Sequence, residues 1–96
     1  MHACALSIEL QIPGAGSLKA KRAAIRPLLD GARARFHVAA SEVAHQDQWQ
    51  RSCLAFAAVG GAAGQVSDIL DKVERFVWSH PEVIVLSSER SWLETG

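Results

Sequence analysis

Residues 36–59 read FHVAASEVAHQDQWQRSCLAFAAV, and this stretch decides the fold. Residues 36–43 have the composition of a β-strand, and residues 52–59 place apolar side chains at alternate positions, as a strand with one buried face does. The two strands are close enough in sequence to pair as a hairpin. The sequence therefore predicts an antiparallel pair in the middle of the chain.

The connection between these strands, Glu42–Arg51, is far more polar than a hairpin requires. Two residues such as Asn-Gly can close a hairpin. This run instead brings together an imidazole, carboxylates, three amides, an indole and a guanidinium. The segment is therefore expected to do more than reverse the chain.

On the N-terminal side, residues 2–12 alternate in polarity and predict another strand with one buried face. Residues 13–16, Pro-Gly-Ala-Gly, end that strand, and Ser17 is suited to cap a helix that begins at Leu18. Pro27 lies inside this helix. Because proline lacks an N–H group and crowds the preceding turn, we predict a kink or local break near residues 23–27.

On the C-terminal side, residues 60–64 form a glycine-rich connection. A second amphipathic helix follows, with apolar residues at helical spacing: Val66, Ile69, Leu70, Val73, Phe76 and Val77. His80-Pro81 ends this helix, and a last strand is expected to begin at Val83 and continue through Trp92.

The resulting order is βαββαβ. Right-handed crossovers convert this order into an α+β, ferredoxin-like sandwich, in which a four-stranded antiparallel sheet carries both helices on one face. The first and third strands are expected to be central. With 96 residues, the chain is predicted to form one domain over 1–96.

Composition excludes several classes of protein. No apolar run approaches the roughly 20 residues that cross a bilayer, and no signal peptide is recognisable, so we expect a cytoplasmic protein with no membrane partner. No cofactor motif, metal-ligand spacing or catalytic motif is present, so no cofactor, metal or catalytic residue is assigned.

The net charge of zero conceals an uneven distribution. Residues 17–35 hold six basic residues and one acidic residue, a net charge of +5. The candidate RNA-binding residues in the first helix are Lys19, Lys21, Arg22, Arg26 and Arg33. Lys19, Arg22, Arg26 and Arg33 are spaced by three, four and seven residues. On a helix, this spacing forms a basic stripe beside the apolar stripe. The stripe predicts contact with the phosphates of RNA or the ribosome, and the alternative is a solvated helix face neutralised by the chain's own acids.

The sheet face away from the helices is predicted to be small and smooth. Its residues are Ala3, Ala5, Ser7, Glu9, Gln11, Ala39, Ser41, Cys53, Ala55 and Ala57. No aromatic side chain is among them, so stacking of RNA bases on this face is disfavoured. The face is better suited to another protein surface, and a homo-oligomer is expected.

His45 and Asp47 are the residues of the polar run that could form a general-base pair or bind a metal. They complete neither a ligand set nor a nucleophile with its base, which favours a structural hydrogen-bonded loop. In that interpretation Trp49 fills a pocket and the Arg51 guanidinium pairs with Glu42 or Asp47.

Several motifs together carry a resemblance to a known family: Ile8-Glu9-Leu10, Ser17-Leu18-Lys19, Lys21-Arg22, Glu42-Val43, His45-Gln46-Asp47, Trp49-Gln50-Arg51 and Leu70-Asp71-Lys72-Val73. The chain resembles the YlxP-like proteins, small bacterial proteins of unknown function. The hairpin residues of this signature are Glu42, His45, Gln46, Asp47, Trp49, Gln50 and Arg51.

The resemblance implies a ferredoxin-like fold and a genetic context of translation initiation and ribosome maturation. Ala44 departs from the family pattern, which commonly has a carboxylate before the histidine, and this weakens a catalytic interpretation. The first hypothesis is a non-enzymatic accessory protein that acts on RNA or the ribosome. The alternatives are an oligomeric protein-interaction module, which uses the open sheet face or the Trp49 hairpin, and a small metal-dependent enzyme centred on His45 and Asp47.

Overall fold

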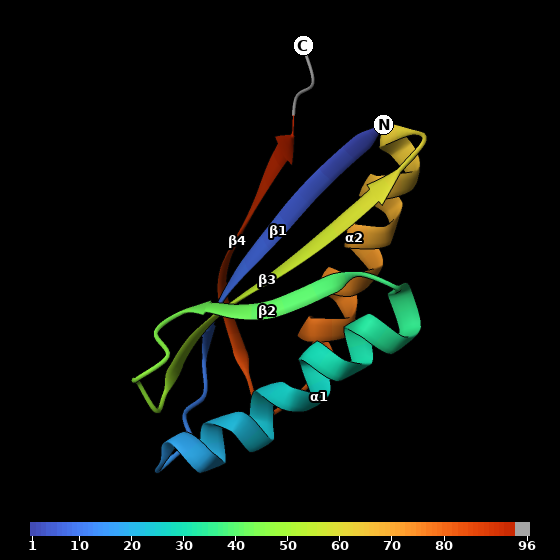
Figure 1. Cartoon of the computed structure of the whole chain (residues 1–96). Coiled ribbons are helices and arrows are strands. Elements are labelled where there is room, and N and C mark those ends of the chain that lie inside the picture. The colour runs from blue at the N-terminus through green and yellow to red at the C-terminus, as the bar shows by residue number, and fades with distance from the viewer. Residues whose placement is uncertain (94–96) are drawn as a thin grey trace.

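The computed structural model describes residues 1–93 and has the predicted order of elements (Figure 1). The elements are β1 (His2–Gln11), α1 (Leu18–Phe36), β2 (Ala39–Ala44), β3 (Arg51–Gly60), α2 (Ala63–Trp78) and β4 (Ile84–Leu93). The βαββαβ prediction is confirmed, with the largest difference at the start of β2, which begins three residues later than expected.

The strands form one sheet in the order β2-β3-β1-β4, and every neighbouring pair is antiparallel. The central positions of β1 and β3 are as predicted. Figure 1 shows α1 and α2 on the same face of the sheet. Leu6 lies opposite Phe56 and Ile8 opposite Leu54, and these buried side chains belong to the core beneath the helices. This topology is that of a ferredoxin-like fold.

The core lies between that face and the helices. It takes alternate residues from the strands and one stripe from each helix, including Leu10, Phe56, Ile25, Leu28, Leu70 and Val73, all at most 4% exposed. Both helices pack on this one face, so within residues 1–93 no helix covers the opposite face of the sheet.

Helix α1 runs without interruption through Pro27, so the predicted local break is wrong. Pro27 is exposed, and the buried residues Ile25 and Leu28 on either side of it keep both halves of the helix on the core. The Ser17 cap is confirmed, since its hydroxyl accepts a hydrogen bond from the Ala20 amide at 3.0 Å. Within residues 1–93, neither helix is long and apolar enough to cross a membrane.

Two β-bulges lie at the same end of the sheet. One interrupts the pairing of β2 with β3 between Glu42 and Ala44, and the other interrupts the pairing of β1 with β4 between Glu9 and Leu10. Bulges bend a strand and redirect its side chains. They adjoin the β2–β3 loop, residues 45–50, where the polar side chains gather.

Candidate functional site: two polar networks at the β2–β3 loop

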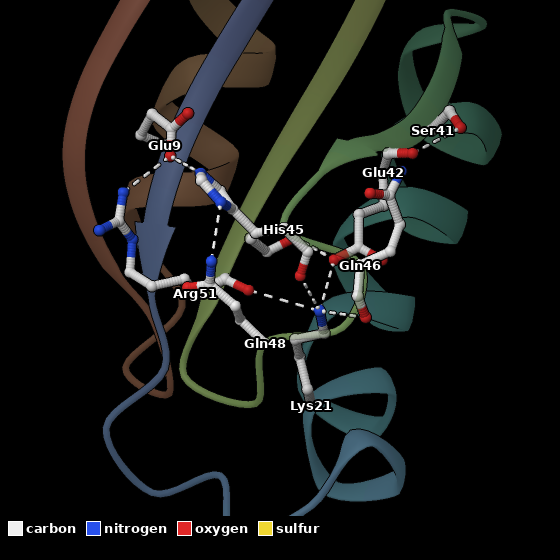
Figure 2. A network of polar contacts seen from close by, with 9 residues as sticks. Glu9, Lys21, Ser41, Glu42, His45, Gln46, Gln48 and Arg51 are labelled. Carbon is white, nitrogen blue, oxygen red and sulfur yellow. Dashed lines mark hydrogen bonds and ion pairs between the residues drawn. The ribbon is translucent and has the colours of Figure 1, made fainter.

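The β2–β3 loop takes part in polar networks on both faces of the sheet (Figure 2). His45 has a φ of 63°, in the left-handed region that few non-glycine residues occupy. Its carbonyl oxygen accepts a hydrogen bond from the Lys21 ammonium at 2.8 Å, while its ring Nε2 lies 3.0 Å from a carboxylate oxygen of Glu9. The strained residue therefore joins the two networks.

The network on the helix side is built around Lys21, which is only 1% exposed. Its Nζ lies 2.8 Å from the Glu42 carboxylate and donates to backbone carbonyls of the loop segment. These carbonyls belong to His45, Gln46 and Arg51, at 2.8, 3.2 and 3.4 Å. Ser52 donates a further hydrogen bond to Glu42 at 2.7 Å. A buried charge with this many partners fixes the loop to α1.

Lys21 is buried because of its position on the helix. It precedes Ile25, Leu28 and Ala32 by four, seven and eleven residues, so it lies on their apolar stripe. The sequence-based assignment of Lys21 to an RNA-contacting set therefore needs revision, since its ammonium is enclosed and bonded internally. A lysine on an apolar stripe was the signal in the sequence for a buried cation.

The second network lies on the open face of the sheet. Glu9 projects from β1, and its Oε2 accepts hydrogen bonds from Arg51 Nη2 at 3.1 Å and from His45 Nε2 at 3.0 Å (Figure 2). The amide of Gln48 lies 3.4 Å from His45 Nδ1. Both ring nitrogens of His45 therefore have a polar neighbour.

The electrostatics of this network do not activate a nucleophile. Partial burial raises the pKa of the Glu9 carboxyl, but hydrogen bonds from Arg51 and Cys53 and the proximity of His45 outweigh it, so this pKa lies below its ordinary value. Burial, together with the charge of Glu9, raises the pKa of the Cys53 thiol. A thiol that stays protonated is a weak nucleophile. Glu9 and Cys53 were not selected from the sequence as site residues, although both faced the open side in the predicted strands.

The structure corrects three expectations for the loop. Trp49 does not fill a pocket, because it is 53% exposed. Arg51 pairs with Glu9 rather than with Glu42 or Asp47. Among residues 1–93 the carboxylate that contacts His45 is also Glu9, and Asp47 is exposed, so the proposed His45–Asp47 pair is not formed.

Gln50 has a role that the sequence did not indicate. Its side-chain amide donates to the carbonyls of Pro13 and Ala15 at 3.4 and 3.3 Å, and its own carbonyl accepts from Ile12 at 2.9 Å. These bonds hold the hairpin against the β1–α1 loop. Within the described part of the chain, no three His, Cys, Asp or Glu side chains gather as a metal-binding group. The arrangement is best suited to holding three chain segments together.

The remaining predicted residues lie on the exposed side of α1. Lys19, Arg22 and Arg26 are exposed and form no ion pair within residues 1–93. Arg33 is engaged, since it contacts Asp30 at 3.0 Å and the carbonyl of Ala40. A shallow pocket of about 230 Å³ between α1 and β2 brings Arg22, Arg26 and Arg33 together.

Removing the Lys21 charge tests the network on the helix side. Lys21→Met is expected to lower the free energy of unfolding by about 3–5 kcal/mol, because it leaves the Glu42 carboxylate without a cation and several carbonyls without a donor. Lys19→Met, on the exposed side of the same helix, is expected to change it by less than about 0.5 kcal/mol. Urea denaturation of both variants measures the difference. A loss below about 1 kcal/mol for Lys21→Met would contradict a locking role.

Acid titration tests the network on the open face. Because the folded pKa of Glu9 lies below its unfolded value, Glu9 contributes stability above that value, and the contribution disappears as the pH falls through the folded pKa. Between about pH 5 and pH 3, Glu9→Gln should therefore lose less stability than the unmodified protein. The control is Glu89→Gln, on the same face opposite Ser7, which should retain the full pH dependence.

Comparisons with known proteins identify the family. The model for "Protein of unknown function (DUF503)" matches residues 3–90. The chain is 37% identical over 84 residues to "Uncharacterized protein YlxP" of Bacillus subtilis (strain 168), covering 88% of this chain and 91% of that protein. A dimeric ferredoxin-like protein from an uncultured marine organism aligns with 96% of this chain and 86% of its own, at 12% identity and a TM-score of 0.43. The resemblance seen in the motifs is confirmed, and the chain belongs to the DUF503 family of YlxP-like proteins.

Proposed function

We propose that this protein is a non-enzymatic RNA-binding accessory that contacts RNA phosphates through the exposed cations of α1. One observation carries the proposal: Lys19, Arg22 and Arg26 lie together on one flank of the helix, and no carboxylate among residues 1–93 pairs with them. Uncompensated cations on a protein of zero net charge concentrate positive potential locally.

The geometry of the flank suits a nucleic-acid backbone. Lys19 and Arg26 are seven residues apart, about 10 Å along the helix axis. The pocket beside Arg22 and Arg26 is also lined by Ile25 and Leu29, so a phosphate held by the guanidinium groups would place its sugar against apolar carbon. The two carboxylates in its lining are paired with other cations, Asp30 with Arg33 and Glu42 with Lys21. The translation context implied by the family resemblance makes ribosomal RNA and the small ribosomal subunit the first RNAs to test.

Filter binding tests this function. If three cations contact phosphates of a single strand, affinity should fall about twentyfold between 50 and 200 mM salt. The double variant Arg22→Glu/Arg26→Glu should abolish binding to ribosomal RNA and to small subunits at low salt. The control Lys72→Glu/Arg75→Glu carries the same change in net charge on α2 and should weaken binding no more than about threefold. No binding by the unmodified protein at low salt would refute the proposal.

A second candidate function, self-association through the open sheet face, is supported by a different observation. The middle of this face is lined by small residues such as Ala5 and Ala57, while Val59, Ile84 and Leu93 are between 48% and 63% exposed at its two ends. Three ten-residue strands offer a face of about 500 Å² per copy. Two such faces together reach about 1,000 Å², the lower limit for a specific interface.

Light scattering distinguishes this candidate from the first. A dimer should show twice the chain mass, and Ala57→Asp should convert it to a monomer, because the carboxylate would be buried without a partner. Ala34→Asp, on the exposed side of α1, should leave the mass unchanged. A monomeric unmodified protein would exclude the dimer and leave the RNA proposal unaffected.

A further inference from the structure

A second basic cluster lies where the C-terminal parts of α1 and α2 meet, away from the flank assigned to RNA. It surrounds a pocket of about 300 Å³, near the lower limit for pockets that hold small ligands. The lining residues are Arg35, Phe36, Lys72, Arg75, Phe76 and Ser79. Arg35 is nine residues beyond Arg26 and lies on the other side of the apolar stripe, so the two basic regions of α1 are separate.

The cations of this pocket have no acidic partners within residues 1–93. None of Arg35, Lys72 and Arg75 forms an ion pair there. Two of the three acids of α2, Asp71 and Glu74, are held by Arg90 of β4 at 2.7 and 3.6 Å, whereas the third, Asp68, is exposed one helical turn before Lys72. Helix α2 therefore directs two of its acids to the sheet edge, and the cations of the pocket outnumber the one acid on their side of the helix.

The negative ends of the two helix dipoles can offset only part of this positive charge. The C-terminus of each helix carries about half a negative charge, so two helix ends offset about one of the three cations. Asp68, four residues before Lys72, offsets part of the remainder, so about one positive charge is left. A net positive charge suits an anion such as a phosphate monoester.

The Arg35 guanidinium is positioned by aromatic rings and not by a carboxylate. Its central carbon lies 5.1 Å from the centre of the Phe76 ring and 5.7 Å from that of Phe36. The rings meet edge to face at 5.7 Å, and Phe76 also packs on His80 at 4.7 Å. Gly31 permits this packing, since a Cβ there would lie 2.5 Å from Phe76. A cation held by ring faces keeps the N–H donors at its edge available for an oxyanion.

We propose that this pocket binds the phosphate group of a small phosphate-bearing molecule of the nucleoside monophosphate class. Arg35, Lys72 and Arg75 supply the donors, and the Phe36–Phe76 pair forms an apolar wall against which a sugar or base can lie. This site is independent of the RNA contact proposed for α1. Either site can be lost without loss of the other.

Isothermal titration calorimetry of the full chain tests the proposal with AMP, inorganic phosphate and adenosine as separate probes. AMP should bind, and adenosine should bind at least tenfold more weakly because it lacks the phosphate. If inorganic phosphate binds as tightly as AMP, the site recognises a free phosphate group. If AMP binds more tightly than inorganic phosphate, the aromatic rings contribute to its affinity. Failure of both AMP and phosphate to bind at millimolar concentration would overturn the inference.

Paired variants locate the binding. Arg35→Gln/Arg75→Gln should weaken AMP binding at least tenfold, while Arg22→Gln/Arg26→Gln, with the same change in net charge, should leave it within twofold. Lys72→Gln alone removes an exposed cation without touching the aromatic packing and should weaken binding severalfold, so the test stands even if the Arg35 variant is unstable. Equal weakening by the two double variants would overturn the proposal, because it would indicate attraction to net charge only.

Discussion

The structure depends on one buried ammonium group. Lys21 lies on the apolar stripe of α1, and a cation removed from water must find acceptors or the fold loses several kcal/mol. The Glu42 carboxylate, two loop carbonyls and the Arg51 carbonyl at the start of β3 provide them. This requirement explains why the β2–β3 connection is longer than a tight turn, since it must bend its backbone oxygens toward the helix while β3 continues in the sheet.

The same bend of the loop also determines which polar contacts form on the open face of the sheet. With the His45 carbonyl directed to Lys21, the left-handed conformation sends its ring to Glu9, where Arg51 also binds. The imidazole at the centre of the loop is thus a junction between two networks. The hairpin signature of the family is explained mainly by hydrogen bonds that join α1, β1, β2 and β3.

The ion pairs also explain how a chain of zero net charge can present basic surfaces. Several acids are engaged internally or by neighbouring cations: Glu9, Asp30, Glu42, Asp71 and Glu74. The cations without such partners within residues 1–93 gather in two regions, around Arg22 and Arg26 on one side of α1 and around Arg35 and Arg75 on the other. Charge balance across the whole chain therefore says little about the potential at either surface.

The order of elements, the central strands and the buried faces can be predicted from the sequence, because they follow from periodicities of two and 3.6 residues that any short window displays. The family can be recognised from the sequence as well. Which polar groups meet depends on the folded chain, since Glu9 and His45 are 36 residues apart in sequence, and Lys21 and Glu42 are 21 residues apart. The exposure of Trp49 and the continuity of α1 through Pro27 depend on packing as well, so the sequence did not indicate them. The local sequence pattern predicts which face of a helix or strand a side chain lies on. The group that it contacts depends on which distant segments the fold brings together.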